Sequence, residues 1–271
     1  MSNLINYNEL WRLLHQKKHS KGVDWDKRAH SFFRAVSGSE EPEKVISSLN
    51  LREADTVLDM GAGTGRFAVP MARKVSHLTA LEPSTGMSSY LEKGMLEAGL
   101  TNYSVVRKRW EDVVIGRDLP VHDVVFASNS LGFPDLAAGL KKLDDAATRS
   151  VHILWFAGNE RHPMDPELAR RLGKDGKGGY WPDYLFILNV LHSLGIYANV
   201  SVEPVRTSHA YEDLDEAVSW WSDRSDIEPD QIPVLREYLA QTLKPMDDGR
   251  ISMSRSGWRA RIWWEKGIRA E

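Results

Sequence analysis

The chain has 271 residues, a formal net charge of -3 at pH 7 and no cysteine. Its length suits one large α/β domain with additions, and its 42% hydrophobic and 27% charged residues are typical of an ordinary globular protein. The absence of cysteine excludes disulfides, cysteine-ligated zinc and a thiolate nucleophile, and the slightly acidic balance disfavours a nucleic-acid substrate.

Nothing in the sequence indicates a membrane segment or a secretion signal. No run of about 18 apolar residues is present, and the N-terminal segment lacks the apolar stretch and small-residue cleavage site of a signal peptide. We therefore expect a cytoplasmic protein without membrane insertion, either a monomer or a homodimer.

The first forty residues predict helical pieces that would cover the rest of the protein. An apolar stripe around Trp11 indicates the first piece, and residues 25–36 indicate the second. We expect residues 1–40 to form an N-terminal helical cap. A third helix is predicted to begin at Glu41, because the proline that follows it suits the first turn of a helix.

Short apolar runs then alternate with amphipathic segments. The runs predict buried strands at 56–60, 77–82, 103–108, 122–128 and 151–158. The segments between them predict helices around 65–75, 84–98 and 134–147. This alternation favours right-handed βαβ units and a parallel sheet that is covered by helices on both faces.

After Gly158 the alternation ends. Residues 159–182 predict a polar loop rich in Gly and Pro, and the segments after it predict a helix at 184–195, a strand at 198–207, helices at 212–224 and 229–243, and a last strand at 256–266. We expect residues 41–206 and 251–271 to form the core, with residues 207–250 as a helical insertion or lid before the last strand.

The strongest local signal is a buried strand that runs through Asp59 into a glycine turn with Gly61, Gly63 and Gly65. Glycines allow a tight turn and a close approach of backbone to ligand. A nicotinamide dinucleotide fingerprint would need glycine at position 66, where this chain has Arg66. A carboxylate at Asp59 would also repel a pyrophosphate, whereas it suits a ligand with an ammonium group.

A second carboxylate lies at the end of the next predicted strand. Glu82 is followed by Pro83 and should project at the carboxyl edge of the sheet, where open α/β sheets bind ligands. A carboxylate at this place can accept hydrogen bonds from both hydroxyls of a ribose. The glycine spacing and the two acids together favour a nucleoside ligand with a cationic end.

Four segments together carry a family resemblance: Asp-Met-Gly-Ala-Gly-Thr-Gly at 59–65, Leu-Glu-Pro-Ser at 81–84, Arg-Trp-Glu-Asp-Val at 109–113, and residues 122–133. They resemble class I S-adenosylmethionine-dependent methyltransferases, over roughly residues 40–160. The resemblance implies an α/β fold with a Rossmann-like, seven-stranded, mostly parallel sheet whose last strand is antiparallel, with helices on both faces. It also implies S-adenosyl-L-methionine as methyl donor and S-adenosyl-L-homocysteine as product.

The resemblance also implies the residues that bind the cofactor. Those around the methionine part would be Asp59, Gly61, Ala62, Gly63 and Gly65. Glu82, beside Pro83, would bind the ribose, while Trp110 and Glu111 would flank the adenine and Asn129 would border the transferred methyl. Core packing of Trp110 and a turn-capping role of Asn129 remain open alternatives.

No catalytic residue can be assigned from the sequence. Methyl transfer from a sulfonium is an in-line displacement whose leaving group needs no proton, so that alignment of the reactants can suffice. A general base is needed only if the acceptor must lose a proton. The candidates for a catalytic role are His15, His19, Asn129 and His162, and no metal site is predicted because no histidine lies in a ligand motif.

We expect the methyl acceptor to be a small molecule. Aromatic residues in the predicted cap and loop, such as Trp11, Trp25 and Trp181, suit the walls of a pocket for a planar or apolar compound. The tetrapeptide with two prolines and an aromatic residue that many nucleic-acid-base and glutamine N-methyltransferases carry is absent. The alternatives are a methyltransferase that acts on RNA or protein, a non-catalytic cofactor-binding scaffold, and a nicotinamide dehydrogenase.

Overall fold

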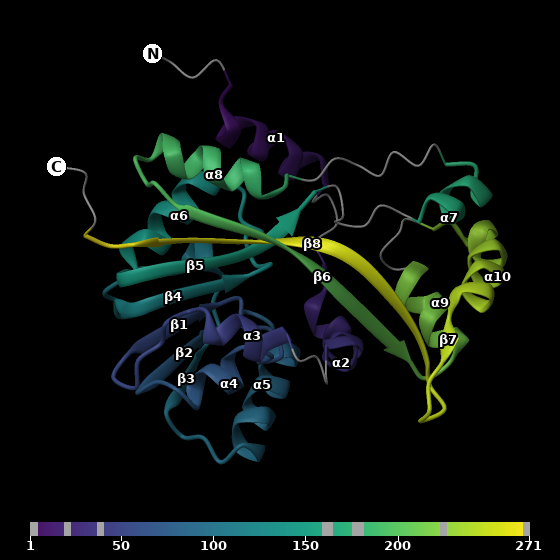
Figure 1. Ribbon diagram of the computed structural model, residues 1–271, viewed down its shortest axis with the longest axis horizontal. Helices are drawn as coiled ribbons and strands as arrows, with labels where there is room; N and C mark the ends of the chain where they lie inside the picture. Colours follow the sequence, from purple (N-terminus) through teal and green to yellow (C-terminus); the bar gives the residue numbers. More distant parts are fainter. Residues whose placement is uncertain are drawn as a thin grey trace.

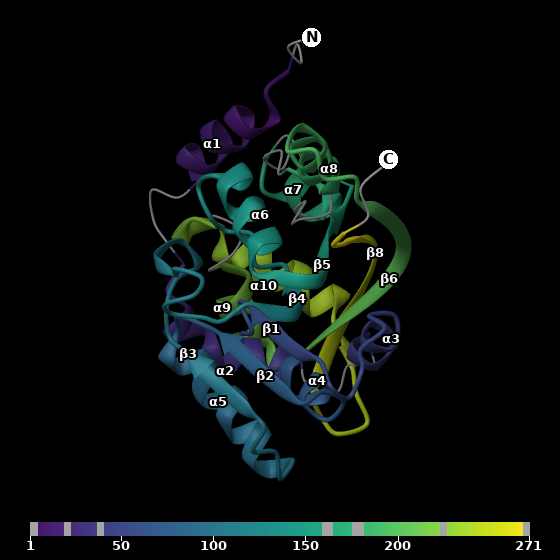
Figure 2. The same ribbon diagram turned by 90° about the vertical axis from the view of Figure 1, so that its left-hand side faces the viewer.

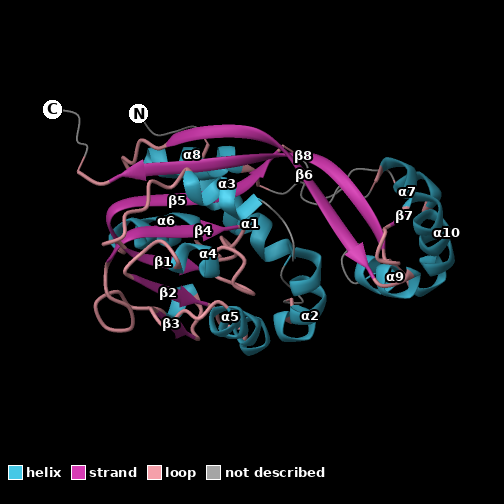
Figure 3. Ribbon diagram, turned by 60° about the horizontal axis from the view of Figure 1, so that its bottom comes forward, coloured by secondary structure: helices cyan, strands magenta, loops and turns pink. Residues whose placement is uncertain are grey.

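A central twisted sheet with helices on both faces continues on one side into a long ribbon of two strands (Figure 1). This computed structural model describes residues 5–18, 23–36, 41–158, 165–174, 182–222 and 227–267. Figure 3 shows the ribbon, made of β6 and β8, leading away from the sheet to a small lobe of helices. Across these ranges, no helix has both the length and the apolar character needed to cross a membrane.

The sheet has the strand order β3-β2-β1-β4-β5-β8-β6, and the two-residue β7 pairs with β8. The strands are β1 (Thr56–Met60), β2 (His77–Leu81), β3 (Tyr103–Val106), β4 (His122–Ser128), β5 (Ala147–Ala157), β6 (Asn199–Tyr211), β7 (Lys244–Pro245) and β8 (Ile251–Glu265). Strands β1 to β5 run parallel, whereas β8 lies antiparallel between β5 and β6. The predicted Rossmann-like sheet, with its antiparallel last strand, is confirmed.

Helices cover both faces of this sheet (Figure 2). The helices are α1 (Tyr7–Lys18), α2 (Trp25–Val36), α3 (Glu41–Ser47), α4 (Ala68–Ala72), α5 (Thr85–Glu97), α6 (Leu136–Asp145), α7 (Pro166–Arg171), α8 (Tyr184–Ser193), α9 (Leu214–Ser222) and α10 (Ile232–Thr242), with short 3-10 turns η1 (Trp110–Asp112) and η2 (Pro229–Gln231). Alternate strand residues separate the two cores: Leu58 packs toward α6 and α8, and Val57 packs toward α4 and α5. The prediction of helices on both faces is confirmed.

Several predicted boundaries differ from the structure, among them the start of β5 at Ala147 and the end of β6 at Tyr211, and two of the differences have identifiable reasons. The helix predicted around 65–75 is only α4, because Gly65 has a φ of +85° and belongs to the turn before the helix. The last strand begins at Ile251 rather than at residue 256, because residues 251–255 pair with the end of β6 to build the ribbon. The added stretch, Ile-Ser-Met-Ser-Arg, is too polar to indicate a buried strand.

The lobe at the end of the ribbon has an apolar cluster of its own. It is formed by α7, α9, α10 and the ribbon's outer end, through Leu168, Tyr211, Ala217, Val218, Trp221, Leu235, Tyr238, Leu239 and Met253. The indole of Trp221 packs inside this cluster and donates a hydrogen bond to the hydroxyl of Tyr211 at 3.2 Å. The lobe therefore packs around its own interior rather than lying as loose helices on the sheet.

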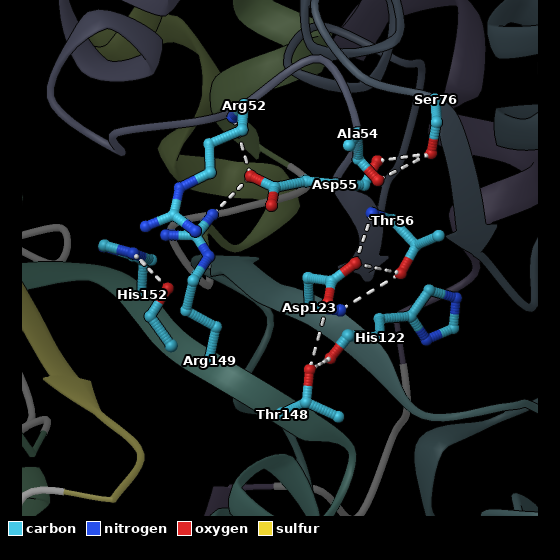
Figure 4. Close-up of polar contacts among 11 residues, drawn as sticks. Arg52, Ala54, Asp55, Thr56, Ser76, His122, Asp123, Thr148, Arg149 and His152 are labelled. Carbon is cyan, nitrogen blue, oxygen red and sulfur yellow. Dashed lines mark hydrogen bonds and ion pairs between the residues drawn. The ribbon is translucent and has the colours of Figure 1, made fainter.

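Polar side chains join the strands at their amino ends, the edge opposite the glycine turn (Figure 4). Asp123 accepts hydrogen bonds from the backbone N–H of Thr56 at 2.8 Å and from the hydroxyl of Thr148 at 3.1 Å. Nearby, Arg149 forms an ion pair with the buried Asp55. These contacts tie β1, β4 and β5 together, so that this edge serves stability and leaves the carboxyl edge for ligands.

His152, on β5 beside this network, gives a prediction for the pH dependence of stability. Burial and the charges of Arg261 and Arg149 lower the pKa of His152 from 6.5 to about 3. Neutral His152 therefore stabilises the fold above pH 6.5, and this contribution is lost as the pH falls from 6.5 toward 3. As the pH falls below 6.5, we expect the free energy of unfolding of the wild type to decrease relative to that of His152→Gln. The expected decrease is up to about 1.4 kcal/mol per pH unit.

Urea denaturation of both proteins at pH 7, 6 and 5 would measure this difference. The comparison with the variant is needed because other buried groups titrate over the same range with the opposite sign, among them Asp59. Parallel stability curves for the two proteins would contradict the assignment.

Candidate functional site

The glycine turn lies at the carboxyl end of β1 and is anchored on β2. The backbone N–H groups of Gly61 and Ala62 donate to the carbonyl oxygen of Leu81 at 2.8 and 3.1 Å. Gly61, Gly63 and Gly65 have φ angles of +75°, +57° and +85°, a region that favours glycine. The turn is therefore held in one conformation that a chain of other residues would adopt only with strain.

The three glycines have different surroundings. A Cβ atom on Gly61 would lie 2.4 Å from the Cβ of Ser130, and one on Gly65 would lie 3.0 Å from Leu91. Among the described residues, a Cβ on Gly63 would meet only Phe32, at 3.9 Å. Gly61 and Gly65 are thus required for packing, whereas a Cβ on Gly63 would meet no close contact in the ranges that the structure describes.

Glu82 lies beside this turn, as the sequence predicted. Only 6% of its surface is exposed. One carboxylate oxygen accepts from the backbone N–H of Gly63 at 2.9 Å, and the other accepts from that of Ser84, also at 2.9 Å. Burial raises the pKa of Glu82, while these two backbone donors lower it. Pro83, between Glu82 and Ser84, is exposed.

Two buried oxygen atoms close to the turn have no hydrogen-bond donor in the described part of the chain. One is Oδ2 of Asp59, on β1, and the other is Oδ1 of Asn129, which follows the neighbouring strand β4. Burial, followed by the charge of Glu82, raises the pKa of Asp59 to about 8. Asn129 has a φ of +54°, an unusual conformation for a residue other than glycine. A ligand that carries N–H or O–H groups would satisfy both oxygens.

Trp110, predicted to flank an adenine or to pack, is buried against α6. Its Nε1 donates to the carbonyl oxygen of Gly139 at 3.3 Å, and the ammonium of Lys142 lies 5.2 Å from its ring centre. This environment favours the packing alternative. Glu111 is exposed, and the adenine role of both residues stays a prediction.

The N-terminal helix α1 docks on the loop after Asn129. Nε2 of His15 lies 2.7 Å from the carbonyl oxygen of Gly132, and Trp11 donates to that of Phe133 at 2.9 Å. Trp11 is therefore a core residue, and its predicted place in a pocket wall was wrong. His19, His162 and Trp181 lie outside the described residues, and in the ranges that are described no group of three or more His, Asp and Glu could hold a metal ion.

The second helix, α2, lies against both the turn and α5. A ring carbon of Phe32 lies 3.9 Å from the place of a Cβ on Gly63, and Phe33 stacks on Tyr90 of α5 with ring centres 4.6 Å apart. Asp26, at the start of α2, contacts the first turn of α5. Asp26 could not be predicted from the sequence, because it belongs to no motif and its partners are about sixty residues away along the chain.

Comparison with known proteins agrees with this geometry. Residues 57–148 match a family described as a methyltransferase domain. An uncharacterized protein of Haemophilus influenzae is 30% identical over 254 residues, covering 89% of this chain and 88% of the relative. The ribosomal RNA small subunit methyltransferase G of Neisseria meningitidis is 27% identical over 163 residues, covering 55% and 72%.

The fold is also similar to that of a solved S-adenosylmethionine-dependent methyltransferase from Thiobacillus denitrificans in complex with S-adenosylhomocysteine. The TM-score is 0.53 at 14% identity, covering 90% of this chain and 97% of the other. Residues 57–148 therefore belong to a methyltransferase-domain family, and the chain has the fold of the class I S-adenosylmethionine-dependent methyltransferases.

The matched segment of this methyltransferase contains the glycine turn, Glu82 and Asn129. S-adenosylmethionine, the cofactor of the family, carries an ammonium group and two ribose hydroxyls. The buried oxygens of Asp59 and Asn129 and the carboxylate of Glu82 are acceptors for such donors. The residues present therefore fit the cofactor chemically.

Proposed function

We propose that this methyltransferase transfers a methyl group from S-adenosylmethionine to a small-molecule acceptor by in-line displacement. The observation that carries the proposal is the set of buried acceptors around an open glycine: Asp59 and Asn129, without donors in the described ranges, and Glu82 beside Gly63. The cofactor supplies a methyl group on a sulfonium, which makes the methyl electrophilic without help from an acid.

Each of these residues has a proposed task. Asp59 and Asn129 would accept hydrogen bonds from the ammonium end of the cofactor, and Glu82 would accept the ribose hydroxyls. Gly63 allows the backbone to approach the ligand, because within the described ranges nothing but Phe32 lies within 4 Å of the place of its missing side chain. Such contacts hold the methyl carbon in line with the acceptor, which is the main requirement of this reaction.

The proposal of a small acceptor is supported by two N-terminal helices that lie next to the candidate site. Helix α1 contacts the loop after Asn129 through His15, and α2 lies over Gly63 through Phe32. With the net charge of -3, this cover favours a small acceptor over a nucleic acid.

We propose that residues 1–40 act as the cap of the site and residues 207–250 as a lid. Arg34 of α2 and Glu216 of α9 join the two through an ion pair at 3.6 Å.

No general base is assigned in this proposal. Nε2 of His15 is engaged with the carbonyl oxygen of Gly132, so that only the other ring nitrogen could take a proton. Asn129 cannot act as a base, and we propose that it contacts the cofactor. A reaction that proceeds by alignment alone is compatible with such a site.

Calorimetric titration with S-adenosylmethionine, S-adenosylhomocysteine and NADH tests the proposal. We expect micromolar binding of the first two and none of NADH. A folded protein that binds neither of the first two would contradict the proposal, and the chain would then be a scaffold without the cofactor.

Similarity to a ribosomal RNA methyltransferase supports one alternative acceptor. Transfer of labelled methyl groups to small-subunit ribosomal RNA, compared with a low-molecular-weight cell extract, separates the two possibilities. We expect label in the extract only, and label in the RNA would contradict a small-molecule acceptor.

Asp59 gives a prediction for the pH dependence of binding. Because its pKa is about 8, the free protein carries a neutral Asp59 at pH 7. An ammonium group favours the ionised carboxylate, so binding should release a proton, and the affinity for S-adenosylhomocysteine should rise by up to about tenfold per pH unit between pH 6 and 8.

Titration at pH 7 in two buffers of different ionisation enthalpy counts the released protons. Asp59→Asn should abolish the release, because the amide does not titrate. Equal proton release by wild type and variant would contradict the assignment of this carboxylate to the ammonium group.

A further inference from the structure

Asp26 connects the cap to the first turn of α5. Its Oδ1 accepts a hydrogen bond from the hydroxyl of Ser84 at 2.9 Å and another from the backbone N–H of Gly86 at 2.6 Å. Ser84 is the N-cap residue of α5, and its hydroxyl oxygen accepts from the backbone N–H of Met87 at 3.0 Å. The Ser84 hydroxyl is therefore fixed from both sides.

The same serine leads directly to Glu82. The backbone N–H of Ser84 donates to Oε1 of Glu82, and Oε2 of Glu82 accepts from the backbone N–H of Gly63, each at 2.9 Å. Hydrogen bonds, joined at Ser84 by the covalent link between its hydroxyl and its backbone N–H, thus connect Asp26 through Ser84 and Glu82 to the glycine turn. Because Glu82 is buried, these donors decide how its carboxylate is oriented.

Charge also links the two acids. The pKa of Asp26 is lowered, chiefly by the Gly86 N–H and then by the Ser84 hydroxyl. Its negative charge is one cause of the raised pKa of Glu82, although burial is the larger one. Removal of the Asp26 charge should therefore lower the pKa of Glu82.

The rest of α2 is held in place without Asp26. Nδ1 of His30 lies 2.8 Å from the hydroxyl of Tyr90, and Phe33 stacks on the ring of the same tyrosine. Arg34, at the other end of the helix, forms ion pairs with Glu212 and Glu216. Loss of the Asp26 carboxylate should therefore leave α2 docked, which separates an effect on Glu82 from an effect on the cap.

We propose that Asp26 is a positioning residue for the cofactor ribose: through Ser84, it sets the orientation in which Glu82 accepts the ribose hydroxyls. This inference rests on the proposed function, since it takes Glu82 as the ribose acceptor. It assigns Asp26 no contact with the cofactor and no part in a bond-making step.

The test compares two ligands that differ only at the ribose. We would measure dissociation constants for S-adenosylhomocysteine and for its 2′,3′-dideoxy analogue by calorimetry, and take their ratio. A correctly oriented Glu82 makes the wild-type ratio large, because only the first ligand carries the hydroxyls. In Asp26→Ala we expect this ratio to fall at least threefold. A residue that merely held the cap would change both constants by the same factor.

Asp24→Ala, directly before the same helix, is the matched control. Asp24 is exposed, and its Oδ1 accepts from the backbone N–H of Lys27 at 3.2 Å, so that its loss weakens the first turn of α2 rather than the link to Ser84. We expect the ratio in this variant to equal that of the wild type.

Gly86→Ala provides a second variant, which keeps Asp26 in the sequence. A Cβ atom on Gly86 would lie 3.1 Å from the Cα, carbonyl oxygen and Oδ1 of Asp26, and should push the aspartate away from Ser84. We expect its ratio to fall in the same direction as in Asp26→Ala. Circular dichroism and thermal melting would show that each variant is folded.

The outcomes separate this inference from the function on which it rests. If wild type discriminates between the ligands and both Asp26→Ala and Gly86→Ala keep its ratio, the positioning role is wrong while the cofactor assignment stands. If wild type binds both ligands equally, the role of Glu82 is wrong, and this inference falls with it. Wild type that binds neither ligand would overturn the proposed function and this inference together.

Discussion

Gly63→Val is expected to lower the affinity for S-adenosylhomocysteine at least a hundredfold while the protein remains folded. In the part of the chain that the structure describes, Phe32 at 3.9 Å is the only contact of a Cβ placed on Gly63. Two γ-methyl groups would extend into the space that we assign to the ligand. Calorimetric titration measures the loss, and circular dichroism checks the fold.

Gly99→Val is the matched control for backbone strain. Gly99 has a φ of +66°, close to the +57° of Gly63, and apart from its chain neighbours no heavy atom of the described residues lies within 4 Å of its Cβ position. Both variants should therefore lose about 1 kcal/mol or more of stability from the left-handed conformation. Only Gly63→Val should lose binding, and normal binding by it would mean that the glycine turn is a structural turn without a ligand.

Glu82→Ala should weaken cofactor binding at least tenfold, more than about 1 kcal/mol. The buried carboxylate is the proposed acceptor for the ribose, and it also accepts the backbone N–H groups of Gly63 and Ser84. Its removal leaves these two donors without their partner and the ribose without its acceptor. Calorimetry with S-adenosylhomocysteine measures the change in affinity.

Glu82→Gln and Glu97→Ala complete this experiment. The glutamine keeps one acceptor oxygen, so its affinity should lie between those of wild type and Glu82→Ala. Glu97 is an exposed residue of α5 that pairs with Lys93 at 3.7 Å, and its loss should leave binding unchanged. An affinity in Glu82→Ala equal to that of wild type would rule out the ribose assignment.

The sheet could be predicted because each of its buried strands is visible in the sequence as a short apolar run. Strands β1 at 56–60 and β4 at 122–128 have the predicted bounds, since strands buried on both faces are continuous apolar runs. The ribbon could not be predicted in the same way. In β8 Met253 is buried, but Gly257 and Arg259, at alternate positions in register with it, carry no apolar side chain, so that no apolar alternation marks the ribbon.

Some residues of the candidate site could likewise be predicted from the sequence, and others could not. The glycine turn, Asp59 and Glu82 were predicted, because the chemistry of a loop that follows a buried strand depends on residues adjacent in sequence. The packing of Trp11 and Trp110 was not decided by the sequence. A large aromatic residue suits a pocket and a core equally, and only its neighbours, Phe133 and Gly139, distinguish them.

The amino-acid sequence by itself determined the parallel sheet, the place of the glycine turn and the acid at the end of the next strand, because periodicity and local spacing encode them. Only the tertiary structure decided that Gly61 is required by Ser130 while Gly63 is open to a ligand. It alone brought Asp26 to Ser84 as well. Such contacts join segments far apart along the chain, and they exist only after the helices have packed on the sheet.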